Sequence, residues 1–280
     1  MRVAVVTDST AYLPADLSHR LTVVPLTVVM NGAEGREGTE VSPADVARAL
    51  SERRVAVTTS RLAPEELVRT YRRLLDEGAD AIVSVHLSAK LSGTVEAARL
   101  AATEFDGRVE VVDSRSAGMG LGFPALAAGA AADRGGDLDT VRRAALTAVD
   151  RTTTLFYVDT LEFLRRGGRI NAASALLGTA LAVKPILHVS DGALALRDRV
   201  RTTGRGLAKL VDLAVQAAGE GRVDVAVHHV AAPERAADLL AALTERLGDR
   251  LDDRYVTEAG AVVAAHAGPG LACIVVHRRG

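Results

Sequence analysis

The chain of 280 residues is long enough for one large domain or two modest ones, and a hydrophobic fraction of 48% allows a sizeable core. The net charge of −1 provides no electrostatic attraction for nucleic acid or for an anionic membrane surface, and an aromatic content of 3% without tryptophan leaves few rings for base stacking. The single cysteine, Cys273, excludes an internal disulfide and a thiolate metal cluster, and it fits a reducing compartment.

The first residues, Arg2–Thr7, predict a strand and lack the apolar core and cleavage site of a signal peptide. No window offers the roughly 20 apolar residues that a membrane span needs. The alanine-rich stretch Ala125–Ala132 is too short and ends at Asp133. We therefore expect a cytoplasmic protein that inserts stably into no membrane and binds no nucleic acid.

Short β-branched runs alternate with helical patterns in the first half of the chain, which predicts an α/β fold with a mostly parallel sheet flanked by helices. The predicted strands are Val3–Val6, Val23–Val29, Val55–Thr58, Ala81–Val85, Val109–Val112 and Leu155–Val158. The predicted helices are Ser42–Ser51, Pro64–Glu77, Thr94–Glu104 and Pro124–Arg134. Ser42-Pro43 supplies an N-cap followed by a proline at the first helical position, and Pro64-Glu65-Glu66 begins another helix; both are common start signals.

The pattern changes near Asp150, after which strands and helices no longer alternate regularly. The predicted strands here are Lys184–Val189, Ala193–Arg199, Val223–Val230 and Ala272–His277, and the predicted helices are Gly204–Ala218 and Pro233–Leu247. The turn Ser190-Asp191-Gly192 favours an antiparallel hairpin. We expect a parallel α/β domain over residues 1–150 and a smaller α+β domain over residues 151–280.

Hydroxyl-rich segments follow four strands of the first half: Thr7–Thr10, Thr58–Ser60, Ser88–Thr94 and Asp113–Ser116. The carboxyl ends of parallel strands share one edge of the sheet, and ligands bind in the crevice outside that edge. Serine and threonine hydroxyls donate to a carboxylate or phosphate without adding charge. Any one segment by itself is better explained by helix capping. Four segments at one edge favour a ligand site.

Other site types have weaker support in the sequence. The run Gly118–Gly122 has the spacing G-x-G-x-G instead of the dinucleotide fingerprint G-x-G-x-x-G. Gly168 is followed by Arg169, so the lysine of a nucleotide-binding loop is missing there. His228 and His229 are adjacent on a predicted strand and point to opposite faces, so they cannot chelate one metal ion together. We expect neither a metal nor a cofactor.

A serine hydrolase acting on acyl esters is the leading enzymatic alternative. Ser92, His266 and either Asp8 or Asp113 are the residue types of a nucleophile, a base and an orienting carboxylate. The segment around Ser92 lacks the G-x-S-x-G elbow. His266 precedes the turn Gly268–Gly270, which predicts a loop position for it.

A glycine pair flanked by three arginines, Arg165-Arg166-Gly167-Gly168-Arg169, predicts the end of a helix. These arginines suit the negative end of a helix dipole, and they suit an anion-binding or partner-docking edge equally well. The pattern alone leaves both interpretations open.

Taken together, these motifs resemble the DegV family along essentially all 280 residues, in the order and rough spacing of that family. The matching segments are Thr7–Ala11, Leu91–Thr94, Asp113-Ser114 with the glycine-rich run after it, Leu161–Ile170, Lys184–Leu187 and His266–Gly270. The resemblance implies a two-domain α/β protein without catalytic machinery of its own, with a long-chain fatty acid in a pocket between the domains. It also implies a partner, the catalytic subunit of a fatty acid kinase. That subunit uses ATP and Mg²⁺ to convert the bound acid to an acyl phosphate for phospholipid synthesis.

The resemblance also implies roles for individual residues. The carboxylate contacts that match the family are Thr59, Ser60, Ser92, Gly93 and His266. Arg169 and Arg201 match basic positions that engage the kinase or the acyl phosphate. The chain departs from the family where Arg61-Leu62-Ala63 replaces the usual Gln-Pro-Ser, which changes one polar wall of the head-group site. A lipid-responsive regulatory module without a kinase is a further alternative.

Overall fold

The computed structural model describes residues 1–19, 21–52, 56–170 and 183–280, and the chain divides into two compact units. Unit 1 comprises Met1–Thr27 and Ser60–Asp150, and unit 2 comprises Val28–Thr59 and Arg151–Gly280. In this division Val28–Thr59 lies in unit 2, together with the second half of the chain.

Unit 1 contains a four-stranded sheet in which every neighbouring pair is parallel, in the order β2-β1-β6-β7. The strands are β1 (Val3–Asp8), β2 (Thr22–Val24), β6 (Ala81–His86) and β7 (Val109–Asp113). Strand β6 is buried along its whole length, as expected for a strand with helices on both faces. The predicted α/β class with a parallel sheet is confirmed.

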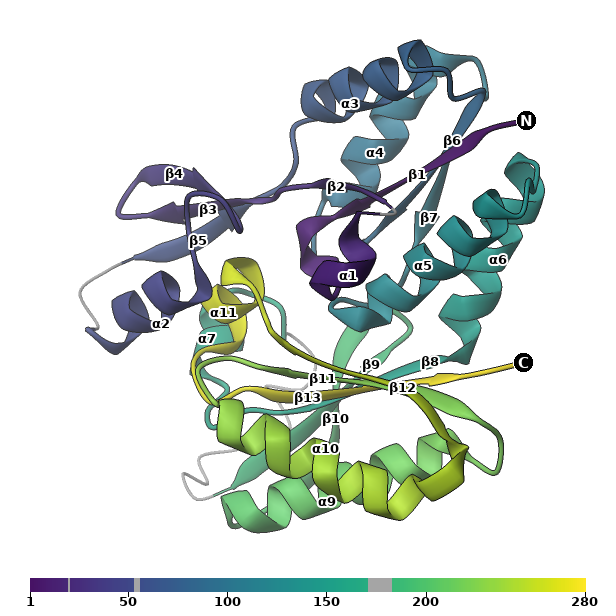
Figure 1. Ribbon diagram of the computed structural model, residues 1–280. Coiled ribbons are helices and arrows are strands. Elements are labelled where there is room, and N and C mark those ends of the chain that lie inside the picture. The colour runs from purple at the N-terminus through teal and green to yellow at the C-terminus, as the bar shows by residue number, and fades with distance from the viewer. Residues whose placement is uncertain (20, 53–55, 171–182) are drawn as a thin grey trace. The chain divides into compact units, whose positions relative to one another are not determined.

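Helices flank this sheet on both faces, with α3 and α4 on one side and α5 and α6 on the other (Figure 1). Their bounds are η1 (Ser9–Ala11), α1 (Ala15–Ser18), α3 (Pro64–Asp76), α4 (Thr94–Ala102), η2 (Thr103–Phe105), α5 (Met119–Asp133) and α6 (Leu138–Arg151). Helix α5 begins five residues before the predicted start at Pro124, so the glycine-rich run forms its first turns. At Gly122 a Cβ atom would lie 2.5 Å from the sulfur of Met119 and 3.1 Å from the carbonyl oxygen of Ala11, so this glycine permits close packing.

The predicted strand Val23–Val29 is divided between two sheets, because Pro25 interrupts it and cannot donate a ladder hydrogen bond. The second part is β3 (Thr27–Met30), which lies between β4 (Ala33–Arg36) and β5 (Val57–Ser60) in a three-stranded sheet. Residue 55, where we predicted the start of β5, is outside the described residues. Asn31 and Gly32 have φ angles of 51° and 83°, as a two-residue hairpin turn requires.

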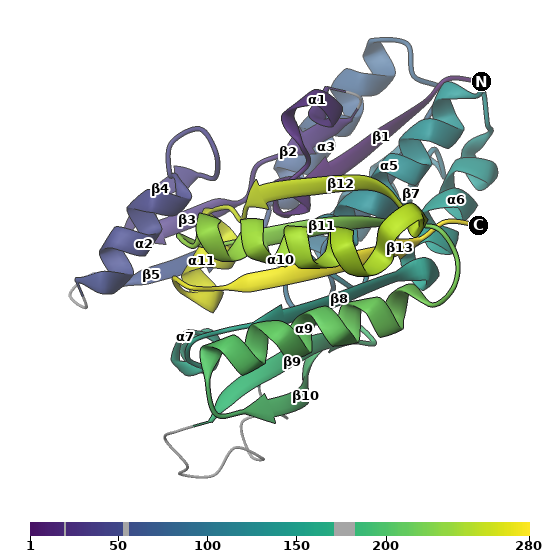
Figure 2. The ribbon, with the colours of Figure 1, turned by 60° about the horizontal axis from the view of Figure 1, so that its bottom comes forward.

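Unit 2 contains a six-stranded sheet in the order β10-β9-β8-β13-β11-β12, which Figure 2 displays strand by strand. The strands are β8 (Thr152–Tyr157), β9 (Lys184–Ser190), β10 (Ala193–Val200), β11 (Val223–His229), β12 (Leu251–Glu258) and β13 (Ala272–Arg278). All neighbours are antiparallel except β11 and β12. The predicted hairpin is confirmed, with Asp191 and Gly192 at φ angles of 48° and 81° in its turn.

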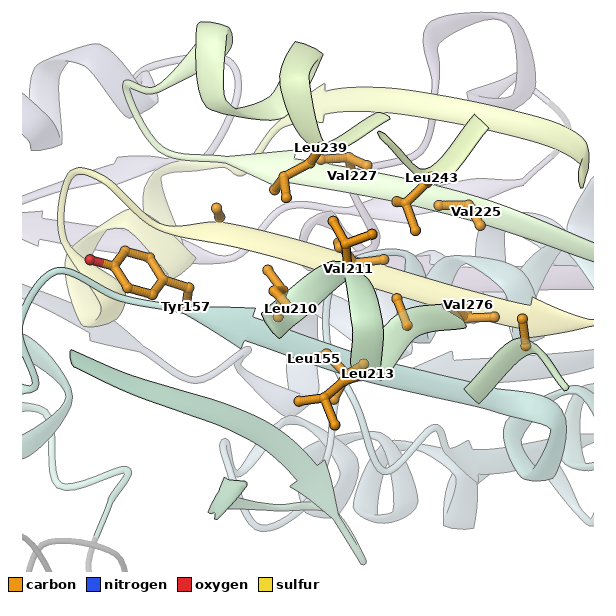
Figure 3. Close-up of a cluster of buried hydrophobic side chains, with 14 of the residues drawn as sticks. Leu155, Tyr157, Leu210, Val211, Leu213, Val225, Val227, Leu239, Leu243 and Val276 are labelled. Carbon is orange, nitrogen blue, oxygen red and sulfur yellow. The ribbon is translucent and has the colours of Figure 1, made fainter. Parts of the chain in front are cut away.

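Helices α9 (Thr203–Ala218) and α10 (Pro233–Leu247) cover one face of this sheet (Figure 2). Between helices and sheet lies an aliphatic core (Figure 3), which includes Leu210 from α9, Leu243 from α10 and Val225 from β11. Burying one such side chain stabilises the fold by about 1.5–3 kcal/mol. The other helices in the described part of unit 2 are α2 (Pro43–Ser51), α7 (Glu162–Arg166), η4 (Gly248–Arg250) and α11 (Ala261–Ala267). No helix of the described residues combines the length and apolar character that crossing a membrane demands.

Candidate functional site

Three of the four hydroxyl-rich segments lie at the carboxyl edge of the parallel sheet in unit 1, as predicted. They follow β1, β6 and β7, which are adjacent in the sheet. The prediction was wrong for the fourth segment, Thr58–Ser60, because β5 pairs with β3 in a different sheet. The segments after β6 and β7 are joined by backbone hydrogen bonds: Ser88 N donates to Ser116 O at 2.8 Å and Ser114 N donates to His86 O at 3.0 Å.

The carboxylate of Asp8, at the end of β1, is fully buried and organises this edge. One oxygen accepts hydrogen bonds from the backbone N–H and the hydroxyl of Thr10. The other oxygen lies 3.0 Å from both the Leu87 N atom and the Nδ1 atom of His86. Asp8 therefore ties the end of β1 to the end of β6.

The polar chain continues inward from His86. Its Nε2 atom lies 2.8 Å from the Ser84 hydroxyl, which in turn accepts a hydrogen bond of 2.8 Å from the Tyr71 hydroxyl. All four side chains from Asp8 to Tyr71 are buried, and burial raises the pKa of Tyr71 above its ordinary value. In this arrangement Tyr71 donates to Ser84, Ser84 to His86 and His86 to Asp8, so every polar atom has a matched partner.

We call Ser88–Thr94 the Ser92 loop. It is a tight turn in which the N–H groups of Leu91 and Ser92 donate to the carbonyl oxygen of Ser88 at 2.9 and 3.1 Å. The Ser92 hydroxyl lies 2.9 Å from the Thr94 hydroxyl and accepts a hydrogen bond of 3.3 Å from the Thr94 N–H. Gly93 is the N-cap of α4 and has no side chain that occupies the space in front of the helix.

Arg61 packs against this same loop. A Cβ atom on Gly93 would lie 3.2 Å from the Cδ atom of Arg61. The stem of the arginine therefore covers Gly93 at the beginning of α4, and Arg61 provides a cation beside the Ser92 loop.

In unit 2, two further residues predicted to contact a carboxylate meet directly. The Oγ1 atom of Thr59 on β5 lies 2.8 Å from the Nε2 atom of His266. The predicted loop position of His266 is wrong, because the residue belongs to the last turn of α11, which ends at Gly268 with a φ angle of 75°. The short helix places the imidazole against β5.

Glycines allow α11 and α7 to pack closely around this histidine. A Cβ atom on Gly167 would lie 2.3 Å from the Nδ1 atom of His266, and a Cβ atom on Gly268 would lie 2.2 Å from the ring of Phe163. The predicted helix end at the glycine pair is confirmed, since Gly167 is the C-cap of α7. The motifs Leu161–Ile170 and His266–Gly270 are therefore packed against each other.

Arg169 belongs to the same group. Its guanidinium donates to the Gly167 carbonyl oxygen, and its charge lies close enough to influence His266. Burial, and to a lesser extent the charge of Arg169, lowers the pKa of His266 from 6.5 to about 4. We call Thr59, Gly167, Arg169 and His266 the His266 cluster. In this cluster the imidazole of His266 is uncharged at neutral pH, and the formal positive charge of the cluster is that of Arg169.

The two remaining predicted residues are exposed. Ser60 is the last residue of β5, and Thr59 and Ser60 point to opposite faces of the strand. Arg201 directly precedes Thr202, whose hydroxyl caps α9 by accepting a hydrogen bond from Arg205 N. An exposed arginine beside a helix start is accessible to a partner.

One polar cluster of unit 2 was not predicted. Asp159 accepts a hydrogen bond of 2.8 Å from the Tyr157 hydroxyl and one of 3.0 Å from Arg235, and Lys184 donates to its carbonyl oxygen at 3.0 Å. Arg235 also donates to the Gly270 carbonyl oxygen at 2.8 Å, which fixes the turn after His266. These residues are scattered over the sequence, so no local pattern indicated their contact.

The contacts of the hydrolase residues differ from those that a catalytic triad needs. Asp8 is bonded to His86, Asp113 accepts a hydrogen bond of 2.8 Å from the Arg115 N–H, and His266 is paired with Thr59. Within the described ranges, no group of three or more His, Cys, Asp or Glu side chains is placed to hold a metal ion. His228 and His229 have separate partners, the Thr257 hydroxyl at 2.7 Å and the Ala232 N–H at 3.4 Å.

Comparison with known proteins places this chain among relatives that share its length and fold. A family described as "Uncharacterised protein, DegV family" matches residues 2–279. A DegV domain-containing protein of Streptomyces coelicolor is 52% identical over 282 residues, which is 99% of each chain. A solved DegV family protein of Thermus thermophilus, described as binding fatty acid, has a TM-score of 0.94 at 37% identity. DegV of Bacillus subtilis, described as a fatty acid binding protein, has a TM-score of 0.90 at 30% identity.

In both comparisons the alignment covers 100% of this chain and 100% of the solved structure. The likeness therefore extends to both units, and the predicted DegV-like fold is confirmed. With the family matched from residue 2 to residue 279, this protein belongs to the DegV family.

Proposed function

We propose that this protein binds a long-chain fatty acid and presents its carboxylate to a separate ATP-dependent kinase, which forms the acyl phosphate. The observation that supports this most directly is the contact of Thr59 with an uncharged His266 beside Arg169. Two solved relatives with the same fold are described as fatty acid binding proteins.

The proposal assigns the carboxylate to neutral donors. The hydroxyls of Thr59 and Ser92, the backbone at Gly93, and the imidazole of His266 donate hydrogen bonds without adding charge, whereas Ser60 points to the opposite face of β5 from Thr59. A hydrogen bond from such a donor to a carboxylate contributes roughly 1.5–3 kcal/mol net. The long-range attraction comes from Arg169 and, beside Gly93, from Arg61.

The acyl chain supplies most of the affinity under this proposal. Roughly fifteen methylenes that leave water at about 0.8 kcal/mol each give on the order of 12 kcal/mol before the cost of ordering the chain. The polar contacts therefore decide mainly where the head group lies. A protein of this kind orients its ligand more than it activates it.

The proposal assigns phosphoryl transfer to the partner. That reaction needs groups that hold ATP and Mg²⁺ in line with the attacking oxygen. The glycine pair of this chain continues with Arg169 where a nucleotide loop has lysine followed by serine or threonine. We assign Arg169 and the exposed Arg201 to contact with the kinase or the acyl phosphate.

Paired ligands test the carboxylate assignment. We expect the protein to bind palmitate more tightly than methyl palmitate, and Thr59→Val to lower palmitate affinity on the order of tenfold. The affinity for the methyl ester is expected to change little. The matched control is Thr58→Val, since Thr58 is the exposed neighbour on the opposite face of β5. Equal affinities for acid and ester in the wild-type protein, with no effect of Thr59→Val, would remove the carboxylate from the proposal.

A further inference from the structure

The N-terminus of α11, the helix that contains His266, lacks a cap from its own segment. Its N-cap residue is Gly260, which has no side chain to accept a hydrogen bond from the first N–H groups of the helix. The acceptor comes instead from Glu37, whose Oε1 atom lies 2.8 Å from the Val262 N atom. Glu37 is 225 residues away in sequence and is 5% exposed.

The backbone around Glu37 is held tightly, so its carboxylate has a defined position. Glu37 directly follows β4, and its backbone forms a bridge with Val41, whose carbonyl oxygen accepts a hydrogen bond of 3.1 Å from the Gly38 N–H. Ser42 then starts α2 with a complete capping box, and α2 packs against α11. The segment from β4 to α2 thus contacts α11 in two ways: helix α2 packs against α11, and the buried carboxylate of Glu37 accepts a hydrogen bond from Val262 N.

The opposite end of α11 contains His266. The helix has 7 residues, so about 10 Å of rigid backbone separates its two ends. If Val262 moves along the helix axis, His266 therefore moves by almost the same distance. Thr59 Oγ1 and His266 Nε2 are 2.8 Å apart, so a displacement of an ångström or more would break this hydrogen bond.

We propose that Glu37 is a positioning residue that fixes α11 along its axis and thereby sets the Thr59–His266 contact. The proposal rests on the proposed function only in its consequence for ligand affinity. An acceptor oxygen at this position satisfies an N–H group that has no partner within the helix, and burial strengthens the hydrogen bond. Glu37 is expected to have no contact with the fatty acid.

Four variants test the proposal, with His266 imidazole nitrogen chemical shifts and palmitate affinity as the readouts. E37A removes the acceptor, and E37D draws it back by about 1.5 Å, one carbon–carbon bond. Both are expected to change the His266 signals and to lower palmitate affinity, E37A by about tenfold. E37Q keeps an acceptor oxygen, so the His266 signals and the palmitate affinity of this variant are expected to match those of the wild type. The control E34A changes an exposed residue of β4 and is expected to match the wild type.

A role in stability alone would lower the free energy of unfolding and leave the His266 signals of the folded protein unchanged. Unchanged signals in folded E37A, or in E37D if E37A does not fold, would overturn the proposal. Wild-type protein that binds no palmitate would refute the proposed function instead, and the His266 signals would still decide the role of Glu37.

Discussion

The Nε2 atom of His266 lies 2.8 Å from the Oγ1 atom of Thr59, although 207 positions separate the two residues in sequence. One residue belongs to β5 and the other to α11, and both elements are part of unit 2. Because the histidine is uncharged at neutral pH, the pair forms a hydroxyl–imidazole contact and not an ion pair.

His266 is expected to titrate far below an ordinary histidine. Burial and Arg169 lower its pKa to about 4 in the folded protein, against 6.5 for an exposed imidazole. The unfolded chain therefore takes up a proton first as the pH falls. The stabilisation is complete above pH 6.5 and is lost between pH 6.5 and 4, on the order of 3 kcal/mol for this one group. NMR titration of the imidazole measures the pKa, and an inflection near 6.5 would contradict the prediction.

His228 is expected to behave in the same way, because burial lowers its pKa from 6.5 to about 4 and the folded protein therefore loses stability as the pH falls below 6.5. The free energy of unfolding, measured with urea, is expected to be lower at pH 4.5 than at pH 7.5, because both His266 and His228 lose their stabilisation. His228→Gln, which cannot be protonated in this range, is expected to reduce the difference between the two conditions. A difference that His228→Gln leaves unchanged would assign the acid sensitivity to other groups.

Gly167→Ala is expected to displace the His266 ring, because the added Cβ atom would lie 2.3 Å from its Nδ1 atom. We expect palmitate affinity to fall on the order of tenfold and the His266 signals to move. Gly204→Ala is the control, since its Cβ atom would meet nothing within 4 Å. The substitution is expected to make helix α9 slightly more stable, because alanine favours a helix more than glycine does. Isothermal titration of both variants with palmitate makes the comparison, and equal affinities would count against the close packing of Gly167.

Asp8→Asn is expected to destabilise unit 1 on the order of 2–3 kcal/mol. Each carboxylate oxygen accepts a hydrogen bond from a backbone N–H, one from Thr10 and the other from Leu87. The amide NH₂ of asparagine would face one of these donors in either orientation. Urea denaturation measures the loss, with the exposed Asp16→Asn as the control; a loss below about 0.5 kcal/mol would show that the network tolerates the amide.

Arg201→Ala is expected to spare palmitate binding and to slow formation of acyl phosphate by a cognate kinase. The side chain is exposed, so its removal leaves the fold intact. Arg72→Ala, an exposed arginine of α3 in unit 1, is the control. Equal loss of lipid binding and acyl phosphate formation would contradict a docking role, and a protein that no kinase accepts would favour the regulatory module.

Much of the fold could be predicted from local patterns. Alternating strands and helices indicated the parallel sheet of unit 1, and Asp191-Gly192 indicated the hairpin of unit 2. The same hairpin signal at Asn31-Gly32 was available and was missed. Strand β12 was missed because charged residues interrupt its apolar alternation, and α11 was missed because its 7 residues are too few for a helical period.

The contacts within the candidate site could not be predicted from the sequence. The resemblance to the DegV family pointed to Thr59, Arg169 and His266, but their contact depends on tertiary pairing between segments far apart in sequence. The assignment of Thr58–Ser60 to the edge of the first sheet failed for the same reason. Pro25 moves the chain from one sheet to another, and local propensity does not specify which sheet the next strands join.

The most direct measurement is the lipid content of the purified protein. Mass spectrometry of an organic extract from protein made in a bacterial host is expected to find fatty acid at about one molecule per chain, and delipidated protein is expected to take up added palmitate or oleate. An extract without stoichiometric fatty acid, together with no uptake of either acid, would contradict the account.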